Sequence, residues 1–119
     1  MTKGYLSFTL HSHLPWVLGH GRWPHGTDWL SEPAAESYIP ILNQLNRSVE
    51  EGFCPRINIG ITPILQEQLK SHYFHNEFEF YLEHKIEAAE NDITEFRRKG
   101  QKQFLSVAKM WRDFYSSIE

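Results

Sequence analysis

The fold is decided by residues 5–16, YLSFTLHSHLPW, where a regular alternation of side chains leads into two closely spaced histidines. Leu6, Phe8 and Leu10 lie at every second position, and most of the residues between them are polar. A period of two places alternate side chains on opposite faces of an extended chain. Residues 5–11 are therefore predicted to form a β-strand.

The two histidines, His11 and His13, follow at the carboxyl end of this predicted strand. If the strand continues through Pro15, both imidazoles project to the side of Ser7 and Thr9, roughly 6.6 Å apart at Cα. Functional residues of β/α folds lie at the carboxyl ends of the strands. The two histidines are therefore candidate site residues.

A second alternating stretch, RINIGITP, occupies residues 56–63 and places its three isoleucines on one face. Between the two stretches, residues 37–51 carry an apolar stripe at helical spacing. Two strands joined by a helical crossover form a βαβ unit, so we predict a parallel pair. A complete β/α barrel takes roughly 250 residues, whereas this chain has 119 and ends at Glu119 within a helical pattern. We therefore expect a truncated, opening part of a larger α/β barrel.

The crossover helix has two interpretations because it contains Pro40. Either a helix from Ser31 is kinked at Pro40, or a helix begins at Ser37 with Pro40 in its first turn, and we favour the second. Before this helix, residues 12–31 are rich in Gly, Pro, His and Trp and have no helical period. They predict a long loop of the kind that usually carries function.

Helices are predicted for the rest of the chain. Thr62 followed by Pro63 is a helix-start pattern, and a short helix through Leu69 should follow it. Apolar residues then recur every three or four positions over residues 74–96 and again over 104–118. Because a basic stretch ending in glycine separates these two segments, we predict two long helices.

Composition limits the classes of partner. A net charge of −3 offers no basic surface for nucleic acid or for an anionic membrane. The amino terminus lacks the continuous apolar segment of a signal peptide, and the single cysteine, Cys54, excludes an internal disulfide. We therefore expect a cytoplasmic protein that binds neither nucleic acid nor membrane. Three of the four tryptophans, Trp16, Trp23 and Trp29, lie in one short segment.

From the residues alone, three interpretations of the histidine pair remain open. Two imidazoles at this spacing can be zinc ligands, with further ligands contributed by later strands. Alternatively, His11 and His13 donate hydrogen bonds to substrate hydroxyls, while the broad faces of Trp16 and Trp23 support sugar rings. In the third interpretation, the pair only packs or caps locally.

Three stretches carry a resemblance to a known family: residues 4–26 (GYLSFTLHSHLPWVLGHGRWPHG), 34–45 (AAESYIPILNQL) and 57–69 (INIGITPILQEQL). They closely resemble glycoside hydrolase family 57 and, within it, the 1,4-α-glucan branching enzymes. HSHLP corresponds to the first characteristic motif of the family. The resemblance implies that residues 1–119 are the amino-terminal part of a family 57 catalytic barrel. That barrel is an incomplete (β/α)7 TIM-like barrel, an α/β fold with parallel strands followed by helices.

The resemblance also implies an activity and a substrate. A branching enzyme cleaves α-1,4-glucan, such as amylose or glycogen, by a retaining mechanism and transfers the segment to a 6-hydroxyl, which forms an α-1,6 branch. By this resemblance, His11, His13, Trp16 and Trp23 bind the glucan along one wall of its cleft. No metal and no other cofactor is implied.

The catalytic groups of the family have no counterpart in this chain. A retaining site needs two carboxyl groups about 5–5.5 Å apart, and the family's nucleophilic Glu and acidic Asp lie in later motifs. Asp28 and Glu32 stand near the loop but outside any strand-end motif. We therefore expect the chain alone to be inactive and to need the missing carboxy-terminal part of the barrel as its partner. The alternatives are a non-catalytic carbohydrate-binding or interaction fragment, and a metal-dependent hydrolase that uses the histidine pair.

Overall fold

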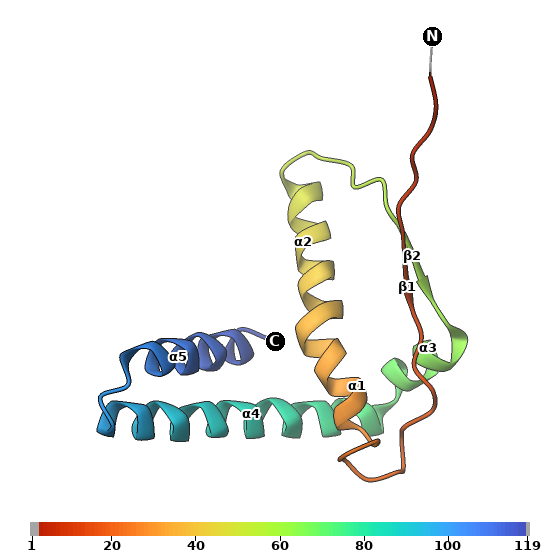
Figure 1. Ribbon diagram of the computed structural model, residues 1–119. Coiled ribbons are helices and arrows are strands. Elements are labelled where there is room, and N and C mark those ends of the chain that lie inside the picture. The colour runs from red at the N-terminus through yellow and green to blue at the C-terminus, as the bar shows by residue number, and fades with distance from the viewer. Residues whose placement is uncertain (1–2, 119) are drawn as a thin grey trace. The chain divides into compact units, whose positions relative to one another are not determined.

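The computed structural model describes residues 3–118 of the chain, which form two compact units. The first unit extends to His75 and holds the strands and the crossover helix, and the second begins at Asn76 and is helical. Each unit is described by itself below, with the element labels of Figure 1. Among the helices formed by residues 3–118, none has an apolar stretch long enough to span a bilayer.

Two short strands, β1 (Thr9–Ser12) and β2 (Asn58–Ile61), pair in parallel and lie side by side in Figure 1. This confirms the predicted parallel pair and the α/β class. Both strands are shorter than their alternating sequences. Two further backbone hydrogen bonds extend the ladder by one residue at each end, from the N–H of Asn58 to the carbonyl of Phe8 (3.0 Å) and from the N–H of Thr62 to the carbonyl of Ser12 (3.3 Å).

The crossover between the strands is helical for most of its length. It consists of α1 (Asp28–Pro33), a π-helical segment η1 (Ala34–Tyr38) and α2 (Ile39–Glu50), which follow one another directly. The loop before it is therefore shorter than predicted and ends where α1 begins. The predicted helix start at Ser37 is therefore wrong. The structure agrees better with the other interpretation, in which a helix begins earlier and passes through Pro40.

The π-helical segment explains how the helix passes through Pro40. Proline has no N–H to donate to the carbonyl of Glu36, and its ring crowds that carbonyl. In the wider π turn, the N–H of Ile39 instead reaches the carbonyl of Ala34, five residues earlier. The helix therefore makes its adjustment directly before the proline and does not restart at Ser37.

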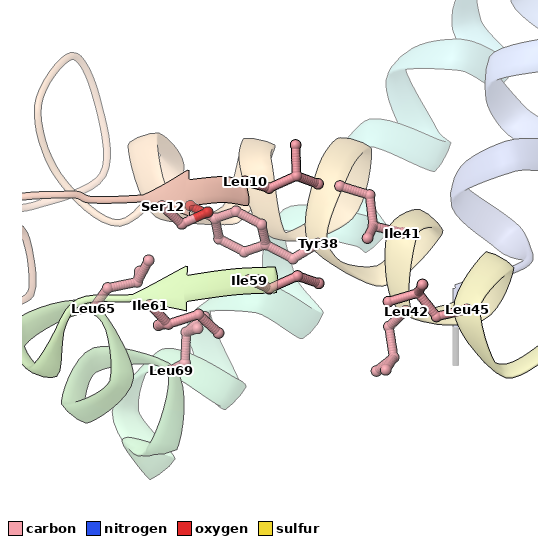
Figure 2. Close-up of a pocket in the computed structure, with 10 residues that line it drawn as sticks. All are labelled: Leu10, Ser12, Tyr38, Ile41, Leu42, Leu45, Ile59, Ile61, Leu65 and Leu69. Atoms are coloured by element: carbon pink, nitrogen blue, oxygen red, sulfur yellow. The ribbon is translucent and has the colours of Figure 1, made fainter. Parts of the chain in front are cut away.

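An apolar groove of about 210 Å³ lies between the strands and the crossover helix. Figure 2 shows side chains from β1, β2, η1, α2 and α3 (Pro63–Lys70) converging on this groove. The groove is open to solvent, since 55% of Leu42 and 51% of Ile61 are exposed. Its lining is almost entirely apolar and comprises Leu10, Ser12, Tyr38, Ile41, Leu42, Leu45, Ile59, Ile61, Leu65 and Leu69.

The short helix predicted after β2 is confirmed as α3 (Pro63–Lys70). It buries two side chains completely, Leu65 and Gln68. Val17, from the loop after β1, and Leu30, from α1, are also buried at 2% and 0% exposure. The centre of the first unit therefore combines residues from a strand-end loop and two helices.

The two long helices predicted near the carboxyl end are confirmed as α4 (His72–Arg98) and α5 (Lys102–Ser116). Within the second unit they pack against each other through aromatic contacts. The rings of Tyr81 and Tyr115 meet edge to face at 6.4 Å between centroids, and both residues are buried. Such pairs stabilise by about 0.5–1.5 kcal/mol beyond the area that they bury.

We predict that Leu65→Ala lowers the free energy of unfolding by about 2–5 kcal/mol, because it leaves a cavity under the groove. Urea denaturation measures this loss. Ile64→Ala is the matched control, because its side chain lies on the same helix but is 47% exposed. It should cost about 1 kcal/mol or less. Equal losses in the two variants would contradict the packing described here.

We also predict that Glu95 titrates far below a normal carboxylate. Hydrogen bonds from Arg98 (2.8 and 3.0 Å), and then from Lys99 (2.8 Å), lower the pKa of Glu95 to about 2. The stabilisation from this cluster is therefore present at neutral pH and is lost as the pH falls from about 4.5 towards 2. Carbon-13 NMR of the carboxyl group measures the titration. Arg98→Met should raise the pKa, whereas Arg97→Met, the control, should not.

Candidate functional site

His11 lies at the carboxyl end of β1, on the face opposite the apolar groove. Its neighbours Leu10 and Ser12 line the groove, so alternation turns the exposed imidazole to the other side. In the ladder His11 pairs with Gly60 of β2. A Cβ atom placed on Gly60 would lie 3.1 Å from Nδ1 of His11, which is closer than such atoms ordinarily approach. The glycine therefore provides the room in which this ring lies.

His13 occupies a different environment from His11. β1 ends at Ser12, so the strand does not continue through Pro15, and the shared alternation expected for the two imidazoles does not extend to His13. Instead, His13 lines an open hollow of about 370 Å³ beside the crossover helix. The other residues that line this hollow are Leu14, Trp29, Glu32, Pro33, Glu36, Ser37 and Tyr38.

Sequence reasoning missed most of this hollow. Trp29, Glu32 and Glu36 lie at positions i, i+3 and i+7, a spacing that brings side chains to one face of a helix. That signal was present in the sequence. A helix that begins at Ser37 leaves these three positions in a loop, whereas α1 begins at Asp28 and places them on helical turns.

Trp16 lies in the loop after β1 and is 50% exposed. Its indole Nε1–H donates a hydrogen bond to the carbonyl of Leu18 at 3.0 Å. The chain on either side of it is tied to α3: Gln68 accepts a hydrogen bond from the N–H of Val17 and donates one to the carbonyl of Pro15. Trp16 therefore combines an accessible ring with an anchored backbone.

Trp23 lies in a small closed loop and is 77% exposed. The loop is closed by hydrogen bonds from the N–H of Thr27 to the carbonyl of Gly21 (3.0 Å) and from Gly26 to Arg22 (3.1 Å). A Cβ on Gly26 would lie inside the Gly21 carbonyl, so only glycine permits this closure. The backbone thus holds the indole out into solvent.

The four predicted residues do not all line the hollow beside the crossover helix. Of them, only His13 lines the hollow, while His11, Trp16 and Trp23 lie on β1 and on the loop that follows it. Chemically, the exposed imidazoles can donate or accept hydrogen bonds, and the indoles offer flat apolar faces. Within residues 3–118, no three His, Cys, Asp or Glu side chains are grouped closely enough to hold a metal ion.

Comparison with known proteins finds similarity to 1,4-α-glucan branching enzymes. The chain is 38% identical to a 1,4-α-glucan branching enzyme of Thermococcus kodakarensis over 118 residues, which are 98% of this chain and 18% of the relative. It is also 38% identical over 79 residues to a probable 1,4-α-glucan branching enzyme of Mycobacterium tuberculosis, covering 66% of this chain and 15% of the relative. No model of a protein family matches the chain.

The structural comparison agrees with the sequence comparison. The crystal structure of a GH57-type branching enzyme from Pyrococcus horikoshii matches 97% of this chain and 22% of its own, with a TM-score of 0.82 and 42% identity. This supports the predicted fold class, the opening α/β portion of an incomplete barrel. The chain therefore spans about a fifth of the length of the relatives that it matches.

We predict that Gly60→Ala displaces the ring of His11, because the added Cβ would lie 3.1 Å from its Nδ1. The ring or the strand must then shift by a few tenths of an ångström. NMR correlation spectra of the imidazole nitrogens should show changed His11 signals and unchanged signals from His72 and His84. Gly4→Ala is the control, because nothing lies near its added Cβ. Unchanged His11 signals in Gly60→Ala would contradict this geometry.

Proposed function

Since this chain is similar to GH57-type 1,4-α-glucan branching enzymes over nearly all its length, we propose that it forms part of such an enzyme. The enzyme would cleave an α-1,4-glucan with retention and transfer the segment to a 6-hydroxyl, which creates an α-1,6 branch. In this proposal, residues 1–119 are the amino-terminal part of its catalytic barrel. The observation that carries the proposal is the similarity in both sequence and fold at a strand end that presents exposed His and Trp side chains.

The role proposed for the chain is to form one wall of the glucan-binding cleft. His11, exposed at the end of β1, would hydrogen-bond a sugar hydroxyl near the bond that is cleaved. Trp16 and Trp23 would stack on sugar faces with their exposed rings. His13 would hold the strand end and the hollow beside α1. An α-glucan such as amylose or glycogen is the proposed partner.

The two carboxylates of a retaining mechanism are proposed to come from outside these residues. Glu32 and Glu36 line the hollow, but both lie on the crossover helix and not at a strand end. The relatives are about five times longer than the matched region, which leaves ample sequence for such groups. The chain alone should therefore bind glucan without converting it. The cytoplasm is its proposed location, since its single cysteine, Cys54, is free and exposed.

A chimeric enzyme tests this function. The matching segment of the Thermococcus kodakarensis relative is replaced by this chain, and branching of amylose is followed by the loss of iodine staining. We expect branching by the chimera. His11→Ala should lower kcat/KM about 10- to 100-fold, the cost of one hydrogen bond to a substrate of roughly 1–3 kcal/mol. His84→Ala, on an exposed position of α4, is the matched control and should leave the rate unchanged.

The chimera, together with two measurements on the purified chain, separates the alternative functions. A folded chimera that does not branch amylose, together with maltoheptaose binding by the 119-residue chain, would favour a binding fragment over an enzyme. Stoichiometric zinc in the purified chain would instead favour the metal-dependent hydrolase. Unchanged branching in His11→Ala would remove this residue from the proposed site.

A further inference from the structure

Gln68 is a polar side chain that is completely buried although it lies on a short surface helix. Its amide makes two long-range hydrogen bonds to the loop after β1. Oε1 accepts from the N–H of Val17 at 2.7 Å, and Nε2 donates to the carbonyl of Pro15 at 3.0 Å. Both hydrogen-bonding groups of the amide are therefore used.

These two bonds reproduce the pattern of a parallel ladder. In a parallel pair, the N–H and C=O of one residue bond to the carbonyl of residue i and the N–H of residue i+2 on the other strand. Gln68 makes this pair of bonds with Pro15 and Val17. β2 has ended at Ile61 by then, because Pro63 starts α3. The side-chain amide thus takes the place of a further residue of β2 and continues the pairing past the end of the strand.

The residue between the two anchored groups is Trp16. The carbonyl of Pro15 and the N–H of Val17 belong to the two peptide units that flank it, so Gln68 restricts both backbone dihedrals of Trp16. The indole is restrained further by its bond to the carbonyl of Leu18. Half of the side chain remains exposed. An aromatic ring that is held in place and accessible binds a sugar at a lower entropic cost than a mobile one.

We propose that Gln68 is a positioning residue, which holds Trp16 in the orientation that receives a sugar ring of the glucan. This rests on the function proposed above for the site. Gln68 is completely buried and does not itself reach the sugar, so its effect on binding passes through the loop segment that carries Trp16. The second βα unit thereby determines the shape of the cleft wall formed after the first strand.

The first test uses the 119-residue chain with Trp16 as the only tryptophan, the other three being replaced by Phe. Acrylamide quenching of its fluorescence reports access to the ring. Gln68→Met preserves the size of the side chain but removes both hydrogen bonds. We expect the quenching constant of Gln68→Met to be about two-fold higher than that of the parent protein, in which Trp16 is 50% exposed. Gln66→Met, an exposed position on the same helix, is the matched control and should have no effect.

A second variant, Gln68→Glu, tests the proposed role of Gln68 even if Gln68→Met does not fold. Burial raises the pKa of the introduced carboxyl above its usual value, because burial disfavours the charged form. At pH 8 the carboxylate cannot donate to Pro15, whereas at pH 5 the protonated acid both donates and accepts like the amide. We expect high quenching at pH 8 that returns to the parent value at pH 5, while the parent protein stays constant. Failure to recover would overturn the proposal.

Maltoheptaose titration then connects the anchored ring to sugar binding. Gln68→Met should weaken maltoheptaose binding about three- to ten-fold, because binding must now order the ring. The positioning role would be overturned if Gln68→Met left the quenching of Trp16 unchanged. It would also be overturned if quenching rose but the affinity for maltoheptaose stayed the same. If the parent chain does not bind maltoheptaose, the proposed glucan function fails, and quenching alone then decides whether Gln68 holds Trp16.

Discussion

The register between β1 and β2 is the constraint on which the rest of the first unit depends. It sets Leu10 opposite Ile59, so that apolar side chains of both strands line one groove with α2 and α3. The same register sets His11 opposite Gly60 on the other face. A slip of one residue would exchange the faces of a strand, because side chains alternate with a period of two. The imidazole would then lie on the side of the apolar groove, and Leu10 and Ser12 would leave it.

Proline determines the second feature that matters for the site. Because a π turn directly precedes Pro40, the helix passes through that residue and extends back to Asp28. This extension carries Trp29, Glu32 and Glu36 to the hollow that His13 lines. One local adjustment of the backbone therefore decides whether these side chains belong to a loop or to a helix face. Single turns of π-helix within α-helices occur frequently at functional sites.

Long-range contacts give several residues roles that their local sequence conceals. Gln68 follows Glu67 in a helix of mixed composition and resembles a surface residue, yet it is fully buried and bonded to a loop more than 50 positions earlier. Gly60 resembles a weak point in a strand, yet it makes room for an imidazole. Gly26 permits a carbonyl to approach so closely that any side chain would collide with it. In all three cases the role depends on a partner that is distant in sequence or that folds back on itself.

By itself, the sequence determined the parallel βαβ order, the face on which His11 lies, the start of α3 and the two long helices. These features follow from periodicity and helix signals within a few neighbouring residues, so local pattern is enough to establish them. It also identified the resemblance that the comparisons support. Only the tertiary structure decided where β1 ends, how the helix passes Pro40, that His13 lines a hollow and that Gln68 bonds to the backbone on both sides of Trp16. The bonds of Gln68 join segments more than 50 residues apart, so no window of local sequence contains both partners. The π turn before Pro40 is local, but periodicity alone does not distinguish it from a helix that restarts after the proline.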